Sequence, residues 1–511
     1  MSQVTVHKSQ IPAGLFFAVL SGLLLALSFP KFNLEFLAWI AYIPLFFALK
    51  DSSRLKAFLL SFGCGLVFWG ITVYWLAYVT VAGTAVLILY LALYFGIFGL
   101  IVRAMALSGP RLFLIPAIWV LLEYLRGQLF TGFPWALLGY SQYLNLPAIQ
   151  IADIFGAWGV SFLVVMVNCV LYSLICHRSQ ATGHKSEKIP VIFACVLIAS
   201  VFVYGFAKLR LSPNNQNQKS VKVSVIQGNI PQELKWYPQA RQEIMEKYIV
   251  LSRLAAQEKP DLIVWPEAAV PVILEEDPEY YEMVRNLAKQ VKIPLLFGAV
   301  TSRQSRYYNS AVMVSQEGEM IGRYDKLHLV PFGEYIPLRR ILPFLEAIVP
   351  IGEVSPGKEY ALFNLNLPGA GHDLRSKFGV LICFEDVFPG LSRQFALRGA
   401  QFLVNITNDA WYQHSFASYQ HFQASVFRAV ENRVSLLRSA NTGVSGFISP
   451  EGKIVSLVRD ARGRELFVDG FKLQPVPVKG ALSIYTRFGD WFIIGLCFLM
   501  GLILLPANRY R

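Results

Sequence analysis

Residues Gly379–Asp386 read GVLICFED, an apolar run that is followed at once by a thiol and two carboxylates. A short apolar run of this kind predicts a buried strand, which we place at Phe378–Cys383. Reactive side chains at the ends of such strands are common in the active sites of α/β proteins. Cys383, which ends the predicted strand, is therefore a candidate nucleophile, and Glu385 follows two residues later.

Two further stretches carry reactive side chains after short apolar runs. WPEAAVP places Glu267 just after the run DLIVW, and RYDKLHLVPFGEYIPL carries Lys326, His328 and Glu334. A thiol attacks an acyl carbon as the thiolate, and its ordinary pKa of about 8.5 means that it needs a base or a cation nearby. A carboxylate can accept the proton, and an ammonium can stabilise the oxyanion. Cysteine, glutamate and lysine are thus a complete set for acyl transfer without a metal.

Strands and helices alternate between about Lys208 and Arg487, which predicts an α/β or mixed layered domain. The predicted strands are Lys222–Gln227, Asp261–Trp265, Pro294–Val300, Ala311–Ser315, Phe378–Cys383 and Phe402–Ile406. The predicted helices are Arg241–Glu258, Tyr280–Val291, Leu391–Arg398 and Phe416–Asn432.

The rest of the chain is far more apolar. Of its 511 residues 55% are hydrophobic and only 15% are charged, against about 25% charged in soluble domains. This composition excludes a disordered chain, a collagen-like chain and an ordinary cytosolic enzyme. It indicates a protein that lies partly in lipid.

Long apolar runs predict about eight membrane-spanning helices, since one crossing needs about 20 apolar residues. They are Ile11–Phe29, Leu34–Leu49, Ala57–Val79, Thr84–Val102, Leu112–Leu125, Phe155–Cys176, Ile189–Ala207 and about Gly489–Leu505. The first run has no small-residue cleavage site after it, so we interpret it as a retained helix rather than a signal peptide. A polar linker, Ser212–Gln218, follows the seventh run.

Basic residues predict the orientation of these helices. With a cytoplasmic N-terminus, the inside segments carry eleven: Lys8, Lys50, Arg54, Lys56, Arg103, Arg111, Arg178, Lys185, Lys188, Arg509 and Arg511. The short outside loops carry two, Lys31 and Arg126. This bias places both termini in the cytoplasm and the α/β domain outside it. We therefore attribute the net charge of +13 to the membrane and not to nucleic-acid binding.

Of the six cysteines, only Cys383 lies outside the apolar runs and their ends. The α/β domain therefore has one thiol and forms no internal disulfide. A lone thiol in an exported domain is either a small buried residue or a reactive nucleophile.

The three reactive stretches, in this order, resemble the Glu-Lys-Cys triad of the nitrilase, or carbon-nitrogen hydrolase, superfamily. Their surroundings resemble the apolipoprotein N-acyltransferase family, as does the arrangement of apolar runs around one α/β domain. These surroundings are QGNIPQELKW, HLVPFGEYIP, NITNDAWY and YTRFGDW. The resemblance covers nearly the whole chain. It implies a multi-pass membrane protein with an inserted αββα sandwich.

The resemblance also implies roles for individual residues. Cys383 would be the nucleophile, Glu267 the general base and Lys326 the oxyanion stabiliser. Glu334 and Glu385 would support the triad, and Trp236 would lie in a mobile arm near the substrate entrance. Phe384 follows the nucleophile where some relatives have tyrosine, so any role of that hydroxyl is unfilled here.

The implied reaction has two steps. A phospholipid would donate an acyl chain to Cys383, and the thioester would pass it to the α-amine of a diacylglyceryl-modified cysteine at the N-terminus of an apolipoprotein. The expected division is a membrane domain (residues 1–210), a catalytic domain on the periplasmic side of a bacterial inner membrane (211–487) and a last span with a short tail (488–511). We expect no cofactor, no metal and a monomer.

Other interpretations remain open. A membrane-tethered amidase or nitrile hydrolase would use the same triad with water as acceptor, and a transporter would carry a large external domain. His328 favours a structural role, because a Cys-His mechanism would leave Glu267 and Lys326 without a function. His414 and His421, seven residues apart, lack the further ligands of a metal site. Glu123 and Arg126 are expected to pair.

Overall fold

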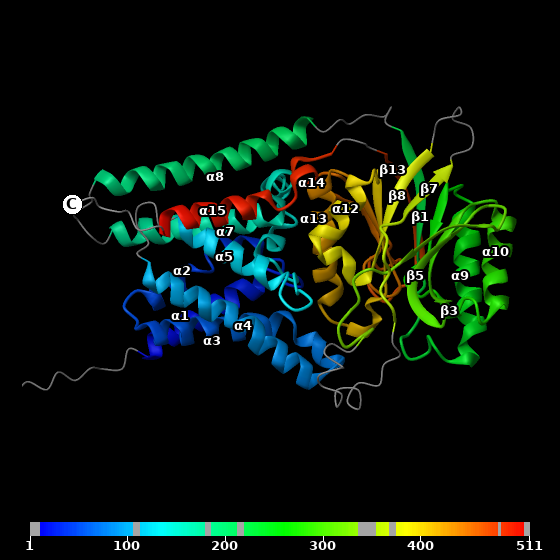
Figure 1. Cartoon of the computed structure of the whole chain (residues 1–511), viewed down its shortest axis with the longest axis horizontal. Coiled ribbons are helices and arrows are strands. Elements are labelled where there is room, and N and C mark those ends of the chain that lie inside the picture. Colours follow the sequence, from blue (N-terminus) through cyan, green and yellow to red (C-terminus); the bar gives the residue numbers. More distant parts are fainter. Residues whose placement is uncertain are drawn as a thin grey trace, which may run out of the picture. The chain divides into compact units, whose positions relative to one another are not determined.

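The computed structural model describes residues 11–105, 113–178, 185–211, 219–335, 354–366, 375–478 and 482–504 (Figure 1). The chain forms two compact units. The first comprises Met1–Leu211 and Asp490–Arg511, and the second comprises Ser212–Gly489. The predicted linker, Lys8, Arg111, Arg509 and Arg511 lie outside the described residues.

The first unit is helical. Its helices are α1 (Ile11–Leu27), α2 (Ile43–Leu49), α3 (Arg54–Thr72), α4 (Val81–Ala104), α5 (Leu114–Arg126), α6 (Leu146–Ile149), α7 (Ala152–Arg178), α8 (Lys185–Leu211) and α15 (Trp491–Leu504), with 3-10 turns η1 (Glu35–Trp39), η2 (Tyr74–Tyr78) and η4 (Leu138–Gln142). Among the described residues, four helices are long and apolar enough to cross a membrane: Arg54–Thr72, Val81–Ala104, Ala152–Cys176 and Ile189–Leu211. This unit is therefore consistent with the membrane part of a membrane protein.

Two of the predicted apolar helices are broken. The run Leu34–Leu49 forms η1 and then α2, because Pro44 lacks an N–H and favours the start of a helix. The run Ala57–Val79 leaves α-helical geometry after Thr72 and continues as η2. Close approach between α3 and α4 depends on Gly99, where a Cβ would lie 1.8 Å from Ser61 Oγ. Small residues of this kind let membrane helices pack closely.

The second unit contains two sheets. One has the strand order β13-β1-β2-β4-β5-β6, with β3 paired to β4, and the other has the order β12-β11-β10-β9-β8-β7. The first sheet comprises β1 (Ser220–Gln227), β2 (Leu262–Val264), β3 (Val270–Ile273), β4 (Leu295–Arg303), β5 (Arg306–Val314), β6 (Met320–Asp325) and β13 (Gly470–Pro477). The second comprises β7 (Leu362–Asn366), β8 (Arg375–Ile382), β9 (Phe402–Thr407), β10 (Ser435–Ala440), β11 (Gly446–Ile448) and β12 (Ile454–Leu457).

Helices cover the outer face of each sheet. α9 (Arg241–Ala256) and α10 (Pro278–Val291) pack on the first sheet, while α12 (Pro389–Leu397) and α13 (Ala417–Asn432) pack on the second (Figure 1). A short helix, α14 (Ile484–Phe488), contacts α12 and α13. The two sheets contact each other through β1 and β10 and through β5 and β8. Reactive groups at the carboxyl ends of β8, β9 and β10 lie together because these strands are parallel.

Candidate active site

Cys383 lies at the first residue of a 3-10 turn, η6 (Cys383–Val387), and not at the end of β8 as predicted. The strand stops at Ile382 because Cys383 turns into the left-handed region, with φ of 53°. Asn405 Nδ2, on the neighbouring strand β9, donates to the Cys383 carbonyl at 3.1 Å. The side chain of Cys383 is 7% exposed, so the thiol lies at a sharp, supported turn inside the domain.

Glu267 follows β2 and lies against β4. A Cβ on Gly298 would come within 2.6 Å of Glu267 Cα, so glycine permits this close approach. The carboxylate accepts hydrogen bonds from Asn309 Nδ2 at 2.7 Å and from the Asn408 main-chain N–H at 2.9 Å. Both of its oxygens are thus held in place.

Lys326 is the first residue after β6 and is 1% exposed. Its ammonium lies 3.0 Å from Glu334 Oε1 and 3.6 Å from Glu267 Oε1. Its main-chain N–H donates to the Asn309 carbonyl at 2.8 Å, which ties this residue to β5. The structure therefore brings Glu267, Lys326 and Glu334 into one contact group.

Electrostatics link this group to Cys383. Burial raises the pKa of the Cys383 thiol, and the Glu267 charge raises it further, while the Lys326 charge lowers it. Burial alone would lower the pKa of Lys326, but Glu334 and Glu267 raise it above its ordinary value. At neutral pH the resting site therefore holds a protonated thiol beside an ammonium. A base must remove the thiol proton before attack, and the Glu267 carboxylate is the charge with the largest effect on that thiol.

Glu385 anchors the turn that carries Cys383. Its Oε1 accepts from the Leu327 N–H at 2.7 Å, the His328 N–H at 3.1 Å and the Tyr324 hydroxyl at 2.8 Å, and its Oε2 accepts from the Ile382 N–H at 2.7 Å. Burial raises the pKa of Glu385 to about 7, although these hydrogen bonds favour the carboxylate. Glu385 thus joins the segment after Lys326 to the segment before Cys383.

Phe384 and His328 pack together beside this turn. The His328 ring lies 3.8 Å from the Phe388 ring and 6.3 Å from the Phe384 ring, measured between centroids. β6 ends at Asp325, so Lys326 and His328 lie after the strand and do not share a strand face. The aromatic contacts agree with a packing role for His328.

The sequence interpretation missed two residues beside Glu267. Asn309 bridges two carboxylates, since its Nδ2 donates to Glu267 and also to Glu334 Oε1 at 2.8 Å. Lys235 is 2% exposed, and its ammonium donates to the Glu267 carbonyl at 3.0 Å. Burial lowers the pKa of Lys235 to about 8, against the effects of Glu267 and Cys383. Neither residue lies in a sequence pattern that predicts a buried polar side chain.

Trp236, the residue after Lys235, is 45% exposed. Its neighbours Leu234 and Tyr237 are also exposed, so three large apolar side chains flank one buried lysine. This segment is joined to the site through Gln232 Oε1, which accepts from Asn408 Nδ2 at 2.7 Å. Gly333 lies in the described loop that carries Glu334.

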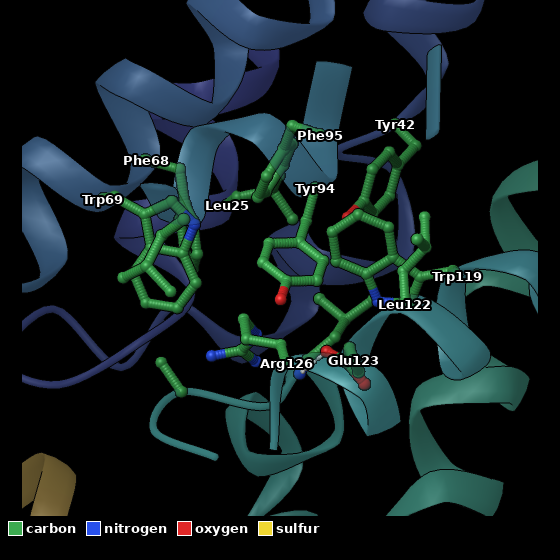
Figure 2. Close-up of a pocket in the computed structure, with 13 residues that line it drawn as sticks. Leu25, Tyr42, Phe68, Trp69, Tyr94, Phe95, Trp119, Leu122, Glu123 and Arg126 are labelled. Carbon is green, nitrogen blue, oxygen red and sulfur yellow. Dashed lines mark hydrogen bonds between the residues drawn. The ribbon is translucent and has the colours of Figure 1, made fainter. Parts of the chain in front are cut away.

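The first unit contains a separate pocket, lined mostly by aromatic rings and by Glu123 and Arg126 (Figure 2). Within the described residues these two make no ion pair within 4.0 Å, and main-chain groups hold each of them instead. Glu123 Oε1 accepts from the Leu138 N–H at 2.7 Å, and Arg126 Nη1 donates to the carbonyls of Phe133 and Trp135, at 2.8 Å each. The lining includes no thiol, so this pocket is not the site of the Cys383 chemistry.

The two histidines that we considered as metal ligands contact other side chains instead. The His414 ring lies 3.7 Å from the Phe467 ring, and His421 contacts Asp386 and Asp409. In the described part of the chain, no group of three or more His, Cys, Asp and Glu side chains is arranged to hold a metal ion.

Two family models match most of the chain. Residues 222–468 match the carbon-nitrogen hydrolase family, which is the class that the two sheets and the Glu-Lys-Cys group define. Residues 21–170 match the apolipoprotein N-acyltransferase N-terminal domain.

Full-length relatives identify the family more closely. The apolipoprotein N-acyltransferase of Geobacter metallireducens is 40% identical and covers 93% of this chain and 91% of its own. That of Methylococcus capsulatus is 33% identical, over 94% and 93% of the two chains. An amidase from Nesterenkonia sp. aligns with 56% of this chain and 98% of its own, at 16% identity and a TM-score of 0.39. The chain belongs to the apolipoprotein N-acyltransferase family.

Proposed function

We propose that this protein transfers a fatty acyl chain from a phospholipid to the α-amino group of the diacylglyceryl-modified cysteine at the N-terminus of an apolipoprotein. The observation that carries this proposal is the group formed by Glu267, Lys326 and Cys383, in a chain of this family. It supplies a base, a cation and a thiol in one buried site. No step of the reaction requires a cofactor.

In the first step Glu267 takes the thiol proton as Sγ attacks the ester carbonyl of the phospholipid. The tetrahedral intermediate carries a negative oxygen, which the Lys326 ammonium stabilises. The C–O bond breaks, and Glu267 returns the proton to the departing alkoxide. The products are a thioester on Cys383 and a lysophospholipid.

In the second step the neutral α-amine of the lipoprotein attacks the thioester carbonyl. Glu267 accepts the amine proton, the C–S bond breaks, and the thiolate regains a proton. The product is an amide, and the enzyme returns to its starting state. Glu334 and Glu385 support the triad by holding Lys326 and the turn before Cys383, and Trp236 lies on the mobile arm at the substrate entrance.

We further propose that the membrane part crosses the bilayer eight times, with residues 1–210 and 488–511 forming the spans. Residues 211–487 then form an αββα catalytic domain on the periplasmic side of a bacterial inner membrane, and both termini are cytoplasmic. The bias of basic residues supports this orientation. The proposed partners are a phospholipid donor and a modified apolipoprotein acceptor, and the active species is a monomer.

A hydrolase that uses water as acceptor is the competing function. Intact mass spectrometry after incubation with phospholipid alone separates the two. We expect an added acyl mass on Cys383 that leaves when a diacylglyceryl-cysteine peptide is supplied, with the acyl chain recovered on the peptide. Release of free fatty acid, with no acylated peptide, would favour the hydrolase.

A further inference from the structure

A second group of charged side chains lies close to the main-chain carbonyl of Cys383. It consists of Asp386 on η6, Asp409 on the 3-10 turn η7 (Asp409–Tyr412), His421 on α13 and Arg438 on β10. None of these side chains is more than 1% exposed. Four elements therefore contribute to one buried charge cluster, which we call the Asp386 cluster.

Arg438 holds the two carboxylates together. Its Nη1 lies 3.0 Å from Asp386 Oδ2 and its Nη2 lies 3.1 Å from Asp409 Oδ2. Nη1 also donates to Asn405 Oδ1 at 2.9 Å, and Asn405 Nδ2 donates to the Cys383 carbonyl. The cluster is thus connected to the main chain of the nucleophile through Asn405.

His421 makes the second connection. Its Nε2 lies 2.7 Å from Asp386 Oδ1 and 3.2 Å from the Cys383 carbonyl. Both of these atoms are acceptors, so Nε2 carries a hydrogen. Two hydrogen bonds, from Asn405 and His421, therefore converge on the carbonyl of a residue whose φ is 53°.

Charge balance indicates whether the other ring nitrogen of His421, Nδ1, carries a hydrogen. Two carboxylates face one guanidinium, so a neutral ring would leave one buried negative charge without compensation, at a cost of several kcal/mol. Nδ1 lies 2.9 Å from Asp409 Oδ1 and 2.7 Å from Arg438 Nη2. With the ring protonated, Nδ1 donates to Asp409, and the approach of Arg438 Nη2 is then a contact between two donors and not a hydrogen bond. Burial and Arg438 lower the pKa of His421, but Asp386 and Asp409 raise it above its ordinary value.

We propose that His421 is a positioning residue: as an imidazolium it fixes the Cys383 carbonyl and cancels the excess negative charge of the Asp386 cluster behind the nucleophile. The inference rests on the proposed role of Cys383 as nucleophile. It matters for the chemistry because the Asp409 charge raises the pKa of the Cys383 thiol. When the Asp386 cluster has no net charge, it does not oppose the effect of Lys326, which favours the thiolate form of Cys383.

The test compares two single variants with opposite net charge and their combination. His421→Gln keeps an N–H donor near Nε2 but leaves the cluster at −1, Asp409→Asn leaves it at +1, and the double variant is neutral. The readout is the pH midpoint for iodoacetamide alkylation of Cys383 in the purified full-length protein, with the modified peptide quantified by mass spectrometry. This readout uses no phospholipid and no lipoprotein, so it stands apart from the test of the proposed function.

We expect the midpoint to rise by about one pH unit in His421→Gln, to fall in Asp409→Asn and to return near the parent value in the double variant. At a fixed pH below the midpoints, this corresponds to a roughly tenfold slower alkylation in His421→Gln. The other charged or titratable groups that act on Cys383 or are influenced by it, Glu267, Lys326, Lys235 and Tyr412, are unchanged in all variants. His414→Gln, whose ring stacks on Phe467, is the matched control and should leave the midpoint unchanged.

An unchanged or lower midpoint in His421→Gln would overturn the proposal, whatever the shift in Asp409→Asn, because loss of the Asp409 carboxylate lowers the midpoint with either charge state of His421. A merely structural loss lowers the melting temperature of both variants but gives no opposite shifts. Should His421→Gln fail to fold, His421→Asn, which also removes the ring charge, takes its place, and an upward shift of the midpoint is again the required result.

Discussion

The side-chain amide of Asn309 donates a hydrogen bond of 2.7 Å to Oε1 of Glu267, the proposed general base. The same nitrogen donates to Glu334 at 2.8 Å, so one amide separates two carboxylates that would otherwise repel each other. The Lys326 ammonium contributes a positive charge close to both glutamates. Asn309 therefore holds one oxygen of each glutamate in a fixed orientation.

Replacement of Asn309 tests this arrangement. Asn309→Asp puts a third carboxylate beside Glu267 and Glu334, which repels both side chains and removes the N–H donor that orients Glu267. We expect acyl transfer from phospholipid to a diacylglyceryl peptide to fall roughly 100-fold or more. Asn309→Ala, which removes the bridge without adding charge, should cost roughly 10-fold. Asn364→Asp, at an exposed position of β7, serves as control, and equal activity of both Asn309 variants with this control would contradict the assignment.

Removal of the thiol has a simple expected result. Cys383→Ala should abolish acyl transfer and leave no acyl mass on the protein after incubation with phospholipid. Because one small buried side chain is shortened, the melting temperature should change by only a few degrees. Turnover near the parent value in this variant would exclude the thioester mechanism.

Lys235 is expected to lower stability while it supports activity. Burial lowers its pKa to about 8, so the folded protein is penalised for holding the ammonium. This penalty appears as the pH falls from 10.5, the ordinary value, through 8, and is complete at lower pH. Lys235→Met should raise the melting temperature by about 2–6 °C at pH 7. It should also slow acylation, because a positive charge beside Glu267 and Cys383 is lost.

The pH dependence makes this prediction specific. The gain in melting temperature from Lys235→Met should shrink as the pH rises from 8 to 10.5, since the parent lysine then becomes neutral. Lys222→Met, at an exposed position of β1, should show no such trend. A variant that is less stable than the parent at pH 7 would show that the ammonium is stabilising where it lies.

Glu385→Gln should weaken the turn that carries Cys383, the proposed nucleophile. Its carboxylate accepts four hydrogen bonds, and the glutamine amide would turn an N–H₂ toward the Ile382 N–H or toward the donors of the Lys326 segment. Two N–H donors that face each other without an acceptor lower the free energy of unfolding by about 1–3 kcal/mol. We expect a lower melting temperature and slower alkylation of Cys383, measured by peptide mass spectrometry. A variant that matches the parent in both measurements would remove Glu385 from the supporting group.

Local sequence patterns were sufficient for several features. The apolar runs before Glu267 and Cys383 predicted the strands β2 and β8. The long apolar runs predicted several helices of the first unit, although two of the runs are broken. The motifs that contain Glu267, Lys326 and Cys383 indicated the family, which the full-length relatives confirm. These inferences succeed because periodicity and short motifs depend on neighbouring residues only.

Other features depend on contacts between residues far apart in the chain. Asn309 meets Glu267 because β5 pairs with β4 and β6, and Arg438 meets Asp386 because β10, β9 and β8 are parallel neighbours. Nothing in the local sequence marks Lys235, His421 or Arg438 as buried, since each is an ordinary polar residue among its neighbours. Their burial becomes favourable only when the folded sheets bring opposite charges and acceptors within hydrogen-bonding distance. The sequence by itself therefore indicated most of the elements and the candidate reacting groups, whereas strand pairing determined which charges surround the thiol. The reason is that electrostatic energy depends on distance in space and not along the chain.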